Sequence, residues 1–171
     1  KKLLIALFFS TLGDVFLMSA GSLFFILGLS SFLIAHLAYI SIFYELTKPV
    51  FVKGVYTYLL FGLLISEVIL LKYLWPNLEG MKVPVLIYAT TICVRLWVSM
   101  LLLRVNKSKG SILIILGALS FVCSDSLLSI RLFIDDFEYA KFWVMCTYLL
   151  AQYLIVSGLL SIFKKSSLGA L

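Results

Sequence analysis

Two aspartates stand inside long apolar runs of this sequence, and they are the residues best placed to do chemistry. Asp14 lies in "LGDVFLM" at positions 12–18, and Asp125 lies in "CSDSLLS" at positions 123–129. A carboxyl group deprived of water favours its uncharged form, and a second carboxyl nearby strengthens that preference in one of the pair. We therefore expect one aspartate to hold a proton at neutral pH, as a general acid must. The alternative is that each only hydrogen-bonds a neighbouring helix.

Polar residues elsewhere in the apolar runs come in pairs. Tyr39 follows His36 by three positions and Tyr148 precedes Gln152 by four, so each pair shares a helix face. Such pairs can orient a substrate or simply satisfy each other. The chain has one histidine, which is too few for a typical zinc site and argues against a zinc hydrolase.

The composition indicates the environment of these residues. Of 171 residues, 63% are hydrophobic and 13% are charged, with a mean hydropathy of +1.16, so the polar surface is too small to cover a soluble globule. The sequence predicts an all-α integral membrane protein, a single transmembrane helical bundle over residues 1–171. We find no basic cluster typical of nucleic-acid binding.

Six apolar runs are long enough to cross the roughly 30 Å core of a bilayer, which needs roughly 20 residues per helix. Turn-forming residues separate the runs, and Pro49 and Pro84 stand where a proline is best tolerated, in the first turn of a helix. We expect helices near residues 3–19, 22–43, 50–71, 83–103, 111–131 and 139–163.

The positions of lysine and arginine predict the orientation of this bundle. Nine lie on the side that holds both termini and four on the other, so both termini should be cytoplasmic. At about 1.5 Å per residue, Asp14 lies roughly 18 Å and Asp125 roughly 24 Å from the cytoplasmic end of its helix. In the helices that follow them, His36 lies roughly 12 Å and Gln152 roughly 18 Å from that end, so all four lie toward the middle of the membrane. The pattern suggests two similar helical hairpins.

Arg95 is the remaining cation and lies inside a predicted span, roughly 13 Å from the cytoplasmic end. We expect it to pair with Glu67 of the preceding helix or to reach a lipid phosphate. The alternative is that its long side chain extends toward water along a lipid-facing surface.

Several stretches carry a family resemblance: "LGDVFLM", "FILGLSSFLIAHLAYISIFY", "VPVLIY", "GALSFVCSDSLLSIRLF" and "WVMCTYLLAQYLIVSG". Together they resemble the YhhN family of membrane proteins, which includes the lysoplasmalogenases, over nearly the whole chain. The most specific parts are the G-A-x-x-F-x-x-S-D run that ends at Asp125 and the T-Y-x-x-A-Q-x-L-I run that holds Tyr148 and Gln152. Family members generally have about eight helices, so by that comparison one or two leading helices are absent from this chain.

The resemblance implies hydrolysis of the vinyl ether bond of lysoplasmalogens to a fatty aldehyde and glycerophosphoethanolamine or glycerophosphocholine. The bond breaks after protonation of its β-carbon, which parallels the two-carboxyl chemistry of glycosidases. We expect Asp125 to be the acid and Asp14 the stabiliser or base, although the order could be reversed. No metal or organic cofactor is required. The predicted substrate-binding residues are His36, Tyr39, Tyr148 and Gln152.

Other functions stay open at this point. Intramembrane carboxyl groups carry protons in pumps, so a proton-coupled transporter of small solutes or lipids, or a lipid-binding protein, is the second hypothesis. A purely structural membrane protein is the third. By resemblance and charge pattern we expect the plasma membrane of a bacterium, with a lysophospholipid and membrane lipids as partners.

Overall fold

The computed structural model describes residues 1–47 and 54–168, which form six α-helices and no strand. Each run expected from the sequence corresponds to one helix, so the predicted all-α bundle is confirmed. Lys48, Pro49, Lys53 and the start of the third predicted span lie outside the described residues. The helices are α1 (Lys2–Leu17), α2 (Ser22–Thr47), α3 (Val55–Leu74), α4 (Lys82–Val105), α5 (Lys109–Phe133) and α6 (Ala140–Leu168).

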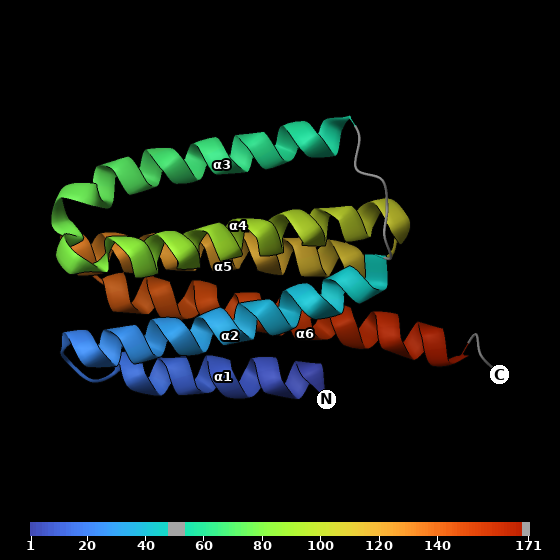
Figure 1. The fold of residues 1–171 in the computed structure, drawn as a ribbon. Helices are drawn as coiled ribbons and strands as arrows, with labels where there is room; N and C mark the ends of the chain where they lie inside the picture. Colours follow the sequence, from blue (N-terminus) through green and yellow to red (C-terminus); the bar gives the residue numbers. More distant parts are fainter. Residues whose placement is uncertain (48–53, 169–171) are drawn as a thin grey trace.

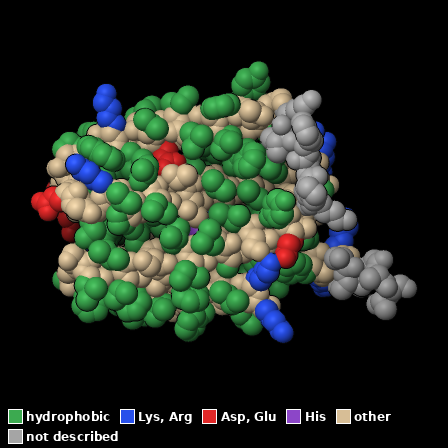
Figure 2. All heavy atoms as spheres, viewed as in Figure 1, with side chains coloured by type: hydrophobic (Ala, Val, Ile, Leu, Met, Phe, Trp, Pro, Cys, Tyr) green, Lys and Arg blue, Asp and Glu red, His purple; other side chains and the backbone are tan. Residues whose placement is uncertain are grey.

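The outer surface of the bundle is that of an integral membrane protein. Five helices in the described part of the chain, α2 to α6, are long and apolar enough to cross a membrane. The first helix, α1, has 16 residues, which corresponds to a length of about 24 Å. In Figure 2, hydrophobic side chains cover most of the visible face, and lysine and arginine side chains lie mainly toward its two ends.

The helices lie side by side, and the connections alternate between the two ends of the bundle (Figure 1). The start of α1 and the end of α6 lie at one end, called the terminal end below. The α1–α2, α3–α4 and α5–α6 connections lie at the other, called the turn end. The most extensive contacts join α1 to α2 and α5 to α6, so the two predicted hairpins exist as antiparallel pairs, with α4 against α2, α3 and α5.

Local residue chemistry explains where these helices begin and end. Gly21 precedes α2 with φ +120°, a conformation that glycine adopts without a steric penalty. Ser108 caps α5, because its Oγ accepts a hydrogen bond from the Ser111 N–H at 3.2 Å. Pro84 lies in the first turn of α4 as predicted. Backbone N–H groups in a first turn have no partner within the helix, so the N–H that proline lacks costs no hydrogen bond there. Two 3-10 turns, Trp75–Asn77 and Glu79–Met81, connect α3 to α4.

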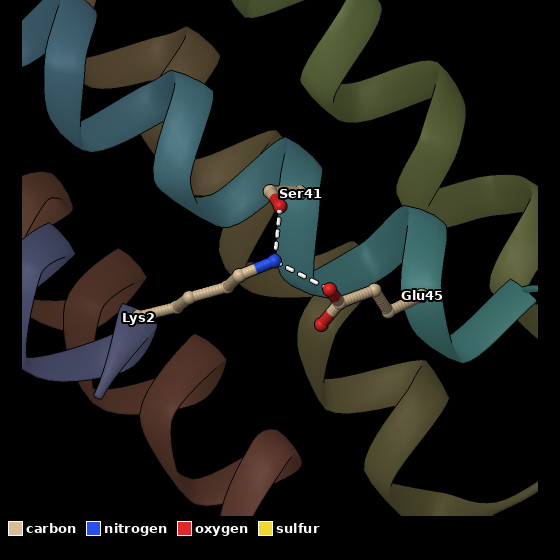
Figure 3. Close-up of polar contacts among 3 residues, drawn as sticks. All are labelled: Lys2, Ser41 and Glu45. Carbon is tan, nitrogen blue, oxygen red and sulfur yellow. Dashed lines mark hydrogen bonds and ion pairs between the residues drawn. The ribbon is translucent and has the colours of Figure 1, made fainter.

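A polar contact joins α1 and α2 at the terminal end (Figure 3). Lys2 forms an ion pair with Glu45 and donates a hydrogen bond to the Ser41 hydroxyl at 2.7 Å. Because these side chains are largely exposed, the ion pair contributes little to stability, on the order of 0–1 kcal/mol. Its effect is on the register of α1 against α2.

Glycines allow α5 and α6 to approach closely. A Cβ atom built at Gly158 would lie 2.6 Å from the backbone oxygen of Gly110, and one built at Gly117 would lie 2.8 Å from that of Ala151. In lipid, helices associate through close van der Waals packing rather than a hydrophobic driving force, so small residues at a contact matter. This contact joins α5, which carries Asp125, to α6, which carries Tyr148.

We predict that Gly158→Ala destabilises the protein. The methyl group has no space because the nearest atom belongs to the backbone of α5, and overpacking of this kind costs about 1–3 kcal/mol. The matched control is Gly62→Ala on α3, where no atom lies within 4 Å of the added carbon. Thermal unfolding in detergent, followed by circular dichroism, should give a lower Tm for Gly158→Ala only. A Gly158→Ala protein that melts at or above the wild-type temperature would contradict this packing.

Candidate functional site

The two aspartates found in the sequence share one cavity. Asp14 of α1 and Asp125 of α5 both line a space of about 830 Å³ at the turn end. Their carboxyl groups are close enough to interact electrostatically. Both side chains are partly buried, and the fold therefore gives them access to a common molecule in a partly enclosed space.

A buried chain of hydrogen bonds ends at Asp125. The Arg95 guanidinium lies 2.9 Å from Nδ1 of His36, Nε2 of His36 lies 3.1 Å from the Tyr88 hydroxyl, and that hydroxyl donates to Oδ2 of Asp125 at 2.9 Å. A guanidinium group has donors only, so Nδ1 of His36 must accept and Nε2 must carry the ring proton. The Tyr88 hydroxyl then accepts a hydrogen bond from His36 and donates one to Asp125. Arg95 thereby sets the direction of every hydrogen bond in this chain.

Arg95 itself is fully enclosed by the protein, with an exposed fraction of 0%. Its guanidinium carbon lies 4.2 Å from the centre of the Phe121 ring and 5.9 Å from that of Tyr39, distances at which an aromatic face attracts a cation. It also interacts electrostatically with Asp125. Within residues 1–47 and 54–168, its Nε and Nη2 have no hydrogen-bond partner.

The predicted pairing of Arg95 with Glu67 is wrong. Glu67 accepts a hydrogen bond from Thr90 at 3.2 Å through Oε1, and its Oε2 has no partner in the described part of the chain. Arg95 instead contacts His36 and Tyr39 of α2 and Phe121 of α5. The proposed extension of Arg95 toward water is also wrong, since the side chain is fully buried.

A second chain of polar side chains ends at Asp14. The Tyr148 hydroxyl lies within hydrogen-bonding reach of Asp14, and Gln152 donates to that hydroxyl at 3.3 Å. The Gln152 amide also donates to Ser10 at 3.0 Å and accepts from Tyr39 at 2.7 Å. Each aspartate therefore has one tyrosine beside it and buried polar groups behind that tyrosine.

An aromatic cluster packs against members of both chains. The His36 ring meets Phe121 edge-to-face at 4.8 Å, and the Tyr148 ring meets Phe121 at 5.5 Å and Phe32 at 5.9 Å. Edge-to-face contacts at these distances are favourable and fix ring orientation. The positions of the hydroxyl and imidazole groups follow from this packing.

All six residues predicted from the sequence belong to the two chains, but they differ in access to the cavity. Among the four predicted substrate-binding residues, Tyr148 lines the cavity. His36 and Tyr39 are buried, with exposed fractions of 1% and 0%, and Gln152 lies behind Tyr148. These three are connected to the cavity linings through hydrogen bonds that lead to Tyr88 and Tyr148.

Ser10 and Tyr88 were not predicted from the sequence, and Arg95 was identified there but assigned other partners. The spacing of these residues along their helices could have indicated them. Tyr88 and Arg95 are seven residues apart and Ser10 is four residues before Asp14, spacings that place residues on one face of a helix. Each therefore shares a face with another polar residue.

A second cavity of about 360 Å³ lies between α3, α4 and α5. Its lining is mostly apolar, and Tyr88, Glu67 and Asp125 are among its polar residues. Four of the described residues line both cavities: Phe25, Asp125, Leu128 and Leu132. Asp125 thus stands where an apolar space and a more polar one adjoin.

The site offers two carboxyl groups in unequal surroundings, which is an arrangement suited to acid–base chemistry. One receives a hydrogen bond whose direction is set by a buried cation, and the other lies beside a tyrosine that a glutamine supports. Within the described residues, no three His, Cys, Asp or Glu side chains gather as metal ligands would.

Comparison with known proteins identifies the family of this chain. The YhhN family matches residues 1–159 of the chain, a range that includes both aspartates and every member of the two hydrogen-bonded chains. No curated protein and no solved structure matches the chain. The match covers nearly the whole sequence, and the chain therefore belongs to the YhhN family.

Proposed function

We propose that this protein is a membrane-embedded hydrolase that cleaves the vinyl ether bond of lysoplasmalogens. The products are a fatty aldehyde and glycerophosphoethanolamine or glycerophosphocholine. The observation that carries the proposal is the position of Asp125, which lines one cavity together with Asp14 and also borders an apolar cavity. Family resemblance supplies the substrate class, and the two carboxyl groups supply the chemistry.

The two cavities suit the two halves of such a lipid. The apolar cavity follows α3 from Leu63 to Leu74, a rise of about 16 Å, and would take the hydrocarbon chain. The larger cavity has Ser19, Ser124 and Tyr148 on its lining and would take the glycerol. The vinyl ether, which joins these two parts, then lies at Asp125.

In the first step, the carboxyl group of Asp125 gives its proton to the β-carbon of the vinyl ether. The π electrons form the new C–H bond, and an oxocarbenium ion remains at the α-carbon and ether oxygen. Because Oδ2 accepts the hydrogen bond from Tyr88, the transferable proton is on Oδ1. The Tyr88 hydrogen bond and the charge of Arg95 stabilise the carboxylate that remains after transfer.

In the second step, the Asp14 carboxylate stabilises the cation and takes a proton from the water that adds to the α-carbon. The resulting hemiacetal collapses as Asp14 returns that proton to the glycerol oxygen and Asp125 takes the hemiacetal hydroxyl proton. Both carboxyl groups regain their starting states, and one water is consumed. Tyr148 orients the water or the glycerol oxygens, while His36, Tyr39 and Gln152 position the tyrosines.

The proposal includes the setting of the reaction. By the positive-inside rule both termini are cytoplasmic, and by family resemblance the membrane is the plasma membrane of a bacterium. Residues 1–171 act as a single helical domain. The larger cavity lies at the turn end, and so it faces away from the cytoplasm.

We predict that Asp125→Asn and Asp14→Asn each lower aldehyde release from lysoplasmalogen by at least about 10²-fold, because an amide cannot exchange the required proton. The matched control is Asp135→Asn, an exposed aspartate in the α5–α6 connection, which should retain full activity. Purified protein in detergent, assayed by a coupled aldehyde dehydrogenase, gives the rates. Wild-type protein that releases no aldehyde but moves a solute with a proton across vesicles would replace the hydrolase by a transporter.

We also predict that Tyr88→Phe lowers kcat by about 10- to 100-fold and leaves KM nearly unchanged, since a hydrogen bond to a charged group contributes about 1.5–3 kcal/mol. The substitution removes the donor to Asp125 without opening the packed core. Tyr153→Phe is the control, because Tyr153 is 69% exposed on the outer face of α6. An unchanged kcat in Tyr88→Phe would show that the chain from Arg95 does not support the acid.

A further inference from the structure

The larger cavity carries two cations at its turn-end mouth. Arg131 of α5 and Lys141 of α6 line it together with the two aspartates, and its other lining residues are uncharged. The reaction proposed above uses the aspartates and leaves both cations without a role. Their positions on facing helices, at the opening of the space that holds the reacting groups, require an explanation.

The distance from the cations to the reacting groups can be calculated from the helix rise. Arg131 is six residues beyond Asp125 on α5, and Lys141 is seven residues before Tyr148 on α6, which correspond to rises of about 9 Å and about 10 Å toward the turn end. Six single bonds separate a vinyl ether carbon from the phosphorus of a glycerophosphate. With one hydrogen bond added, that reach is on the order of 10 Å.

The local chemistry at the mouth suits a phosphate ester. Arg131 donates through Nε to Asp136 at 3.0 Å, which orients the guanidinium plane, and its two terminal nitrogens are the ones suited to bidentate phosphate binding. Lys141 lies in the first turn of α6, where the helix dipole also favours an anion. Asp136 is 62% exposed, and neither it nor Asp135 lines the cavity.

We propose that Arg131 and Lys141 form the subsite that binds the phosphodiester of a lysolipid headgroup. This inference rests on the proposed hydrolase function and extends it to the choice of substrate. The headgroup binds at the turn end, the vinyl ether lies between the aspartates, and the hydrocarbon chain enters the apolar cavity. The protein therefore selects phosphate-bearing lysolipids over uncharged glycerol ethers with the same chain.

A binding experiment separates this subsite from catalysis. The probes are a 1-O-alkyl lysophosphocholine, which lacks the vinyl double bond and cannot be hydrolysed by this route, and the 1-O-alkylglycerol of equal chain length. Arg131→Gln and Lys141→Gln should each weaken the Kd for the phospholipid by about 10-fold and change that for the alkylglycerol by less than roughly twofold. Lys141→Arg should restore phospholipid affinity. Lys72→Gln is the control, because Lys72 is an exposed cation near the turn end of α3 that lines neither cavity.

Each other outcome overturns the subsite in a recognisable way. If the glutamine variants bind the phospholipid as the wild type does, Arg131 and Lys141 do not hold the phosphate, and aldehyde release by the wild type still stands as a separate result. Equal loss of affinity for both probes would mean a damaged cavity instead of a lost phosphate contact. If inorganic phosphate binds the wild type as tightly as the lysolipid does, the two cations form a site for a free anion and not for a lipid headgroup. Wild-type protein that binds neither probe but releases aldehyde from lysoplasmalogen would overturn the subsite alone. Wild-type protein that also releases no aldehyde would overturn the hydrolase as well.

Discussion

Inside a bilayer a polar side chain must find its partners within the protein, because no water is there to supply them. The constraint is strongest for Arg95, because its side chain is fully buried and has hydrogen-bond donors only. Its hydrogen bond to His36 leaves one possible arrangement for Tyr88 and Asp125. A cation that lines neither cavity thereby sets the direction of the hydrogen bonds that lead to Asp125.

Packing turns this constraint into a site. The glycine contact between α5 and α6 joins the helices that bring Asp125 and Tyr148 to the same cavity, and Phe121 packs against a ring from each of the two polar chains. Helix α3 packs mainly on α4 and contacts α5 little, which leaves room for the apolar cavity beside Asp125. Helix α5 therefore packs tightly against α6 on one side and borders the apolar cavity on the side of α3.

Counting along the chain was enough to predict the helices and six of the residues in the candidate site. Bilayer thickness sets the length of an apolar run, and a polar residue within such a run stands out at a depth that follows from helix rise. Depth does not give rotation about the helix axis, which is why Glu67 was wrongly paired with Arg95. Tyr88 was missed because tyrosines are common at membrane surfaces, and its local sequence does not distinguish it from the exposed Tyr58 and Tyr73.

The central claim is that a carboxyl group held in the membrane protonates the β-carbon of a vinyl ether. The most direct test is turnover of a lysoplasmalogen by the purified protein in D₂O, with the aldehyde trapped at once by borohydride so that its hydrogens cannot exchange. Mass spectrometry of the resulting fatty alcohol should find one solvent deuterium on the carbon next to the alcohol carbon in every molecule. Alcohol that carries no deuterium at that carbon, or a reaction that yields no aldehyde at all, would contradict the account.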